Sequence, residues 1–403
     1  MAAVMLALEL YRSLPRYAAS RLVTRHVSGV SAGPLTPLRL VSRDEPRLPR
    51  DGWARVRPRL SGICGSDLGA LYGSTSLYFS TLVSMPFVPG HEIVGDLSDD
   101  CGDLPAGTRV VLDPVLACAA RGVDPCTSCA QGATNRCDRI TVGHVSPGLQ
   151  TGYCADTGGG WGAQLVAHST QLHAVPDALD DRRAVLIEPL SCAVHTALRA
   201  QVPDGASVLV VGSGAVGLFT TLALRELTSA GSITVVAKHP LQRDLARRFG
   251  ATEVLAPSDV FGGVRRATRA LRLDPERGEP YLLGGVDIAI DAAGSRASLE
   301  TALRTARAGG KAVLCAMPPA GADLSPVWFR ELEVVGTYAS ARSEPGQDRR
   351  SGFQIATELA ARAPIDGLVG DTYPLHRWRE ALDHASSAGR LGTVKVAFDL
   401  RSK

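Results

Sequence analysis

A glycine array between an apolar run and a helical pattern constrains the fold of this chain more than any other feature. In VLVVGSGAVGLFTTLAL the apolar run ends at Gly212, and Gly214 and Gly217 complete a G-x-G-x-x-G spacing. The first glycine permits a tight turn, the second lets the backbone approach a pyrophosphate, and the third lets the helix pack on the strand. The N-terminus of the helix attracts phosphate. The array predicts a dinucleotide site, with a purely structural turn as the alternative.

The residues around this array alternate between strand and helix patterns. The apolar runs SVLVVG, SITVVAK, EVLA, VDIAID and KAVLCAM have the length of buried strands, and the segments GLFTTLALREL, LQRDLARRF and LETALRTARA have helical periodicity. Such alternation predicts βαβ units and a parallel, doubly wound sheet of the Rossmann type. Residues 258–285 fit this pattern least well, and we expect one helix and a surface excursion there.

The residues on either side of this region have a different texture. Residues 1–195 are rich in glycine, proline and short β-branched runs such as ARVRPRL and AQLVAH, which indicates short strands joined by turns. After about residue 343 the pattern is mixed, with an amphipathic segment, PLHRWREALDHASSAG, and a last strand, TVKVAFDL. Near the start we expect MLALEL to form a strand and the basic residues after it to form a surface loop; a transit peptide is the alternative.

Composition narrows the class of protein. A chain of 403 residues with a formal charge of +3 is expected to form two domains, and it has no basic blocks that would bind nucleic acid. The chain contains no run of 18 apolar residues, so we expect no membrane span. The nine cysteines and the lack of a recognisable export signal favour metal or catalytic use over disulfides, and therefore a cytoplasmic protein.

The end of the second predicted strand bears on the choice of cofactor. NAD sites usually carry an acid about 20 residues after the glycine array. Here Ala237 is followed by Lys238, His239 and, further along, Arg243. Cations favour a 2′-phosphate, so the sequence predicts NADP over NAD. The alternative is that these are solvated charges and both cofactors bind.

Three separated motifs carry potential zinc ligands. They are GICGSD with Cys64, PGHEIVG with His91 and Glu92, and IEPLSCAVH with Glu188. A catalytic zinc site needs three protein ligands of this kind and an open fourth position. With GSGAVG, the cysteine cluster and the closing GRLGTVKV, these motifs resemble the zinc-dependent medium-chain alcohol and polyol dehydrogenases over nearly the whole chain.

The resemblance implies a domain for each part of the chain. A catalytic domain of GroES-like β-barrel fold would comprise residues 1–195, with a cysteine lobe at about 113–140. A Rossmann cofactor domain would comprise residues 196–341, and residues 342–403 would return to the catalytic domain. The family also implies a small-molecule alcohol or ketone substrate, NADP or NAD as cofactor, and a dimer or tetramer.

The resemblance also implies a role for each residue of the catalytic site. Cys64 and His91 match two zinc ligands, and Glu188 matches the third. Glu92 matches the acid behind the metal, which approaches or replaces a ligand. Ser66 matches the hydroxyl that accepts the substrate's proton. Two alternatives stay open: Glu188 as a carboxylate that does not bind zinc directly, and Cys192 as a ligand in its place.

The cysteine lobe resembles the structural zinc site of the same family. Cys118, Cys126, Cys129 and Cys137 would bind the metal as four thiolates in a closed tetrahedron. The family spaces these cysteines by two, two and seven residues, whereas seven residues separate the first pair here. We interpret the difference as a five-residue insertion. The alternative is a set of free cysteines with Cys118 outside the site.

The implied chemistry is hydride transfer between an alcohol and a nicotinamide, and one part of its proton path is missing from this chain. Many relatives carry a histidine shortly after the serine, but this chain has Gly69 there. Trp161, Tyr78 and Phe79 are weaker candidates for the substrate pocket. The rival interpretations are a zinc-independent quinone or enoyl reductase and a non-catalytic NADPH-binding protein on the same fold.

Overall fold

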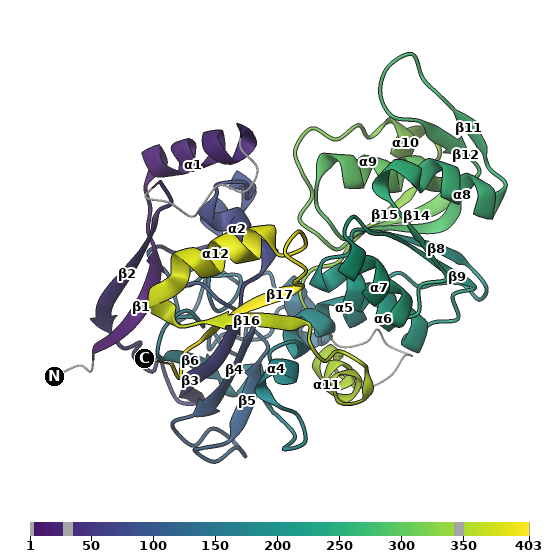
Figure 1. Ribbon diagram of the computed structural model, residues 1–403. Helices are drawn as coiled ribbons and strands as arrows, with labels where there is room; N and C mark the ends of the chain where they lie inside the picture. The colour runs from purple at the N-terminus through teal and green to yellow at the C-terminus, as the bar shows by residue number, and fades with distance from the viewer. Residues whose placement is uncertain (1–3, 27–34, 342–349, 403) are drawn as a thin grey trace. The chain divides into compact units, whose positions relative to one another are not determined.

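The computed structural model describes residues 4–26, 35–341 and 350–402, which form two compact units (Figure 1). The first unit comprises the described parts of Met1–Glu188 and Asp348–Lys403, and the second those of Pro189–Gln347. The boundaries predicted from the sequence lie after residues 195 and 341. The second of them borders residues 342–349, which lie outside the described residues.

Six parallel strands form the central sheet of the second unit, in the order β10-β9-β8-β13-β14-β15. Numbered along the chain, this order is 3-2-1-4-5-6, which is the doubly wound arrangement of dinucleotide-binding sheets. The strands are β8 (Ser207–Val211), β9 (Ser232–Val236), β10 (Glu253–Leu255), β13 (Val286–Asp291), β14 (Ala306–Leu314) and β15 (Glu333–Gly336). The helices are α5 (Ile187–Arg199), which begins in the first unit, α6 (Ala215–Leu227), α7 (Pro240–Arg248), α8 (Val260–Thr268), α9 (Arg296–Thr305) and α10 (Ser325–Phe329).

The sequence patterns locate most of these elements, but not all, and the short helix α10 was not predicted. Residues 306–308 were expected at the end of a helix, but they begin β14. The strand β15 was not predicted, because its run EVVG is short and mostly exposed. The expected excursion within 258–285 is a helix, α8, followed by a hairpin of β11 (Leu271–Leu273) and β12 (Tyr281–Leu283).

The first unit is built around a mixed sheet in the order β16-β17-β3-β4-β5-β7, with β6 also paired to β3. Its pairs are antiparallel except for β16 with β17, which is the GroES-like arrangement expected for this half of the chain. The strands are β1 (Val4–Leu10), β2 (Leu38–Asp44), β3 (Trp53–Gly62), β4 (Ile93–Leu97), β5 (Arg109–Leu112), β6 (Leu165–His168), β7 (Leu172–Ala174), β16 (Val369–Tyr373) and β17 (Lys395–Asp399). The helices are α1 (Leu14–His26), α2 (Gly65–Leu71), α3 (Thr127–Ala130), α4 (Asp181–Ala184), α11 (Gly352–Arg362) and α12 (Trp378–Ser387). Short 3-10 turns are η1 (Leu77–Thr81), η2 (Thr134–Arg136), η3 (Ser169–Gln171), η4 (Pro257–Asp259, in the second unit) and η5 (Leu375–Arg377).

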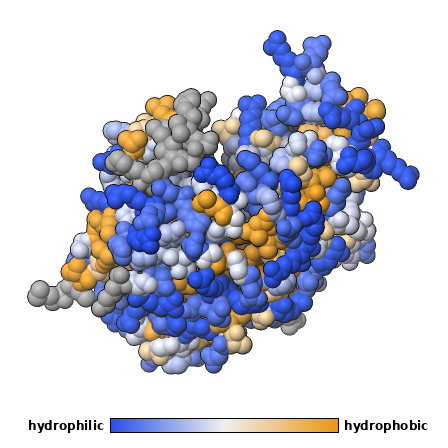
Figure 2. All heavy atoms as spheres, in the orientation of Figure 1, coloured by the Kyte–Doolittle hydropathy of each residue, from blue (hydrophilic) through white to orange (hydrophobic). Residues whose placement is uncertain are grey.

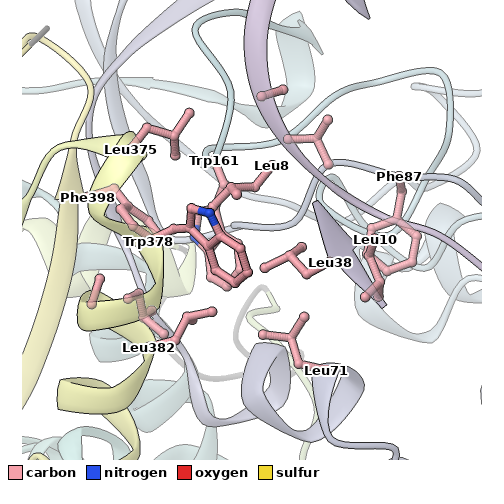
Figure 3. Packing of buried hydrophobic residues seen from close by; sticks show 14 of the residues in the cluster. Leu8, Leu10, Leu38, Leu71, Phe87, Trp161, Leu375, Trp378, Leu382 and Phe398 are labelled. Atoms are coloured by element: carbon pink, nitrogen blue, oxygen red, sulfur yellow. The ribbon is translucent and has the colours of Figure 1, made fainter. Parts of the chain in front are cut away.

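Trp161 lies in a hydrophobic cluster of the first unit, so it is a core residue and not a wall of a substrate pocket. Its side chain is fully buried, and its ring meets that of Phe398 edge-on at 5.3 Å between centroids. Figure 3 shows it among leucines from β1, β2 and α12, together with Trp378. The cluster therefore ties the first strands of the chain to its last helix and strand.

The region between β1 and β2 differs from the sequence-based expectation. The strand predicted for MLALEL is confirmed as β1, which pairs antiparallel with β2. The surface loop expected after it was wrong, because residues 14–26 form helix α1. Pro15 stands near its start, where proline is compatible with a helix, and Tyr17 and Arg21 fall four residues apart on one face.

Polar residues cover most of the face seen in Figure 2, with apolar residues in separate patches. Within the described residues, no helix is both long and apolar enough to span a bilayer.

Candidate functional site

The pairing of β3 with β4 brings the GICGSD and PGHEIVG motifs together. Cys64 follows the end of β3 and caps the N-terminus of α2, while His91 and Glu92 come directly before β4. In the antiparallel register Ser61 lies opposite Ile93, and the N–H of Gly62 donates to the carbonyl of Glu92 at 2.9 Å. His91 and Glu92 follow Cys64 by 27 and 28 positions in the sequence, and the pairing of β3 with β4 makes them its neighbours.

Cys64, His91 and Glu92 form a compact set of donor atoms. One ligand atom from each lies within 4.8 Å of the others, and the two later residues are buried. A thiol, an imidazole and a carboxylate are the three kinds of zinc ligand found in proteins. The residues present therefore fit a zinc ion.

The glycine-dense segment before β6 holds the loop that leads to His91. The N–H groups of Gly160 and Trp161 donate to the carbonyls of Gly90 and Pro89, both at 2.9 Å. A side chain at Gly159 would begin 2.1 Å from the carbonyl oxygen of Val88, so only glycine allows this approach. The sequence indicated a turn here but not its partner.

Asp67 lies beside both Cys64 and His91, and no role was predicted for it from the sequence. Its Oδ2 accepts the Cys64 N–H at 3.0 Å, and its Oδ1 lies 3.3 Å from His91 Nδ1. Burial alone would lower the pKa of His91. The charge of Asp67, and the interactions of His91 with Asp67 and Cys64, outweigh burial and raise that pKa well above its usual value. A carboxylate beside Nδ1 fixes the imidazole ring and leaves Nε2 to bind a metal.

A buried lysine holds Glu92, and this residue too was not predicted from the sequence. Lys395 on β17 donates from Nζ to Glu92 Oε1 at 2.6 Å, and both side chains are almost completely buried. Burial lowers the pKa of Lys395, but the charges of Glu92 and Cys64 outweigh burial and raise it. Within the described residues, Glu92 Oε2 is buried without a hydrogen-bond partner. Oε1 of Glu92 thus accepts from the lysine, and Oε2 remains available to bind a metal.

Glu188 does not belong to the compact set, and neither does Cys192. Glu188 lies buried in the first turn of α5, and its charge acts on Lys395 and on Asp113. Burial, with the charge of Glu188 adding to it, raises the pKa of Asp113 to about 7. Of the two predicted carboxylates, Glu92 is therefore the one that the structure groups with Cys64 and His91.

The four cysteines of the lobe come together, Cys118 included. Their sulfur atoms all lie within 4.8 Å of one another, and none is in a disulfide. Backbone N–H groups point at two of the sulfurs, at 3.3 Å on Cys118 and 3.4 Å on Cys137. Burial opposes ionisation of Cys126, but donors including the N–H of Asp138 outweigh burial and lower its pKa to about 6. Four converging sulfurs supplied with N–H donors suit a closed zinc–thiolate site.

The longer spacing between Cys118 and Cys126 contains a buried arginine. Arg121 is fully buried and donates to five backbone carbonyls. Those carbonyls belong to Leu116, Val142, Val145, Ser146 and Gly148. The additional residues between Cys118 and Cys126 therefore stabilise the lobe through Arg121. The spacing of the cysteines in the sequence does not predict this.

The glycine array of the second unit has the geometry that its spacing predicts. Gly212 has a φ of 114°, and a side chain at Gly217 would begin 2.2 Å from the Gly212 carbonyl oxygen. Gly214 caps the N-terminus of α6, and no atom lies within 4 Å of its would-be Cβ. The turn requires glycine at 212, and close packing requires it at 217. Gly214 borders open space at the N-terminus of α6, and such a position fits a pyrophosphate.

The carboxyl end of β9 brings the predicted cations together. Ala237 is buried, Lys238 is exposed, and His239 precedes α7. Arg243 donates from Nε to the Ala237 carbonyl at 3.1 Å and from its terminal nitrogen to the Lys238 carbonyl at 3.4 Å. Two backbone acceptors thus hold its guanidinium at the end of the strand.

Comparison with known proteins agrees with both halves of this description. A model described as alcohol dehydrogenase GroES-like domain matches residues 50–177, and one described as zinc-binding dehydrogenase matches residues 215–350. The chain is 30% identical over 357 residues to L-idonate 5-dehydrogenase of Vitis vinifera, covering 86% of this chain and 87% of that one. It is 27% identical over 334 residues to sorbitol dehydrogenase of Bacillus subtilis, covering 80% and 84%.

A solved structure extends this similarity to the whole chain. A protein from Sinorhizobium meliloti 1021, described as a zinc-binding dehydrogenase and bound to NADP, superimposes with a TM-score of 0.69 at 25% identity. The match covers 98% of this chain and 99% of that one.

Proposed function

Since the chain belongs to the zinc-type medium-chain alcohol and polyol dehydrogenases, we propose that it transfers hydride between a polyol, or the matching ketone, and NADP. The observation that carries the proposal is the convergence of Cys64, His91 and Glu92 at the junction of β3 and β4. A zinc-independent reductase would need none of these three donors, which makes that alternative the weaker one.

Each residue around the proposed catalytic zinc has a physical role. Zinc at this position supplies Lewis acidity, which lowers the pKa of a bound hydroxyl group. Asp67 orients His91, and Lys395 holds Glu92 and balances its charge. Ser66 is partly buried in the first turn of α2, and in this proposal it accepts the proton of the substrate. We assign Cys64, His91 and Glu92 as ligands, with Glu188 as the carboxylate that replaces Glu92.

The cysteine lobe has a structural role in this proposal. Cys118, Cys126, Cys129 and Cys137 leave no open position for a substrate when they bind one zinc ion. The buried Arg121 beside them fixes the surrounding loop. The lobe would therefore contribute stability and no chemistry.

The second unit binds the nicotinamide cofactor in this proposal, and NADP is the preferred form. The nicotinamide accepts or returns the hydride, and the protein supplies binding and orientation. The pyrophosphate would lie at Gly212, Gly214 and Gly217. Lys238, His239 and Arg243 stand where an acid would otherwise bind the ribose hydroxyls, and Arg243 in particular suits a 2′-phosphate.

Polyols are the proposed substrate class because the relatives are named for them. The names sorbitol dehydrogenase, L-idonate 5-dehydrogenase and D-xylulose reductase all refer to sugar alcohols, sugar acids or keto sugars. A second candidate, a simple alcohol, has no comparable support. Polyols also offer neighbouring hydroxyls that a polar site can distinguish.

A homo-oligomer and a cytoplasmic location complete the proposal. The outer strand β15 has no partner on its far side among the described residues. The helix before it exposes Trp328 and Phe329 at 84% and 67%, and β15 itself exposes Val334. A second copy of the chain would cover this apolar edge. All nine cysteines are free, which suits a reducing compartment.

A panel of polyols and their ketones, assayed with NADP and with NAD, tests the proposed function. We expect turnover of at least one sugar alcohol, with NADP giving the higher kcat/KM. Cys64→Ser should abolish turnover but leave NADPH binding intact. Binding of NADPH without turnover of any alcohol or ketone by the zinc-loaded enzyme would favour the non-catalytic alternative.

A further inference from the structure

The proton path beyond Ser66 needs a substitute for the histidine that this chain lacks. Ser66 and Gly69 lie three positions apart on α2 and therefore on one face of that helix. A histidine at position 69 would extend from this face. With glycine there, the position that the side chain would occupy is bordered by other side chains.

Two hydroxyl groups border this position. Ser74 Oγ and Thr75 Oγ1 each lie 3.4 Å from the point where a Cβ on Gly69 would be. The chain folds back on the helix because the N–H groups of Ser74 and Thr75 donate to the Gly69 carbonyl, at 3.0 and 3.3 Å. The backbone thus fixes both hydroxyls beside the missing side chain.

The two hydroxyls differ in a way that gives the path a direction. Thr75 Oγ1 is buried and has no hydrogen-bond partner within the described residues, which is costly for a hydroxyl group. Ser74 is exposed, and its hydroxyl donates to the Gly69 carbonyl at 3.3 Å. One hydroxyl is therefore free to relay a proton inside the protein, and the next one meets solvent.

We propose that Thr75 takes the place of the absent histidine, as a hydroxyl relay that carries the substrate's proton from Ser66 to solvent. This inference rests on the proposed function. During oxidation the substrate carbon gives hydride to the nicotinamide, and the substrate's hydroxyl proton passes to Ser66. The proton of Ser66 moves to a water beside Gly69, that water gives a proton to Thr75, and Thr75 releases its own proton to solvent at Ser74. Each hydroxyl regains what it gives, so the net products are a ketone, reduced cofactor and one proton.

Thr75→Val is the central variant, because it removes the hydroxyl and keeps the shape. Thr75→Ser keeps the hydroxyl and is its matched partner. Thr81→Val is the control, since Thr81 is an exposed threonine of η1 in the same segment. Zinc per chain and NADP affinity should equal wild type in all three variants.

The assay separates proton release from hydride transfer. The zinc-loaded enzyme oxidises its best polyol in a single turnover while a pH indicator follows the proton and absorbance follows the reduced cofactor. Thr75→Val should slow proton release about tenfold or more, and added imidazole should restore it by filling the space at Gly69. Thr75→Ser and Thr81→Val should match wild type, and Gly69→His should rescue Thr75→Val.

A structural measurement gives a readout that needs no turnover. A crystal structure of the zinc-loaded enzyme should show a water within about 3 Å of both Ser66 Oγ and Thr75 Oγ1. Wild-type proton release in Thr75→Val without an imidazole effect, or a Thr75 hydroxyl turned away from that space, would overturn the relay alone. A wild-type enzyme that oxidises no polyol would overturn the proposed function and the relay with it.

Discussion

Replacing Lys395 with methionine should destabilise the first unit more than any ordinary surface substitution. The Lys395 ammonium lies 2.6 Å from Glu92, with exposed side-chain fractions of 6% and 1%. Methionine has a similar length but leaves a buried carboxylate without its cation. Breaking a buried pair from one side costs about 3–5 kcal/mol, so the free energy of unfolding of the zinc-free protein should fall by that amount.

The magnitude can be separated from a general effect of losing a cation from the first unit. Arg377→Met removes the cation of a pair with Glu380 in which the side chains are 49% and 57% exposed, and it should cost much less than Lys395→Met. Glu92→Gln combined with Lys395→Met should recover most of the loss, since no unpaired charge is then buried. Zinc should also reduce the loss, because it offers Glu92 a second positive partner.

Urea unfolding followed by tryptophan fluorescence measures these differences. Three of the four tryptophans, Trp53, Trp161 and Trp378, lie in the first unit, so the signal reports mainly on it. An unfolding free energy for Lys395→Met within about 1 kcal/mol of wild type would show that the buried pair contributes little. It would mean that the buried carboxylate of Glu92 does not need Lys395 as its partner.

The geometry of the glycine array, of Arg243 and of His173 leads to three further expected outcomes. Gly214→Ala should weaken NADP binding without changing thermal stability, because the added Cβ enters open space. Gly217→Ala should lower the melting temperature, because its Cβ would lie 2.2 Å from the Gly212 carbonyl oxygen. If calorimetry and cofactor titration gave the same effects for both variants, this expectation would be wrong. Arg243→Ala should raise the Kd for NADP about tenfold and leave that for NAD unchanged, as fluorescence titration would show. His173 stacks on Phe353 with centroids 4.8 Å apart, and burial lowers its pKa to about 4. The unfolded chain takes up a proton near pH 6.5 and the folded chain only near pH 4, so stability should fall as the pH drops through that window; a pH–stability profile unchanged in His173→Phe would count against it.

Local patterns explain why much of the fold could be predicted from the sequence. The G-x-G-x-x-G array fixes its own turn, because Gly212 and Gly217 are required by backbone angle and close packing. Apolar runs of strand length specify β8, β9 and β13 whatever their surroundings. β15 was not predicted, because an edge strand buries little apolar surface and its sequence therefore lacks a long apolar run.

The candidate site could be predicted only as far as its motifs. Cys64 and His91 lie in short motifs, but the cation that supports Glu92 lies 303 positions away, on the last strand. Only the pairing of β17 with β3 brings Lys395 to the site. Chain order likewise cannot decide which of two carboxylates lies nearest the thiol, and the structure groups Glu92 there instead of Glu188. The assignments of individual residues as zinc ligands stay predictions.

Zinc content per chain, measured by elemental analysis, tells whether both donor sets bind metal. The wild type should contain about two zinc ions, one in each donor set. Cys64→Ser and Cys129→Ser should each contain about one, with NADPH binding preserved in the former. A wild type with about one zinc ion, unchanged by Cys64→Ser and lost in Cys129→Ser, would mean that only the cysteine lobe binds metal. The catalytic site would then have to be sought elsewhere.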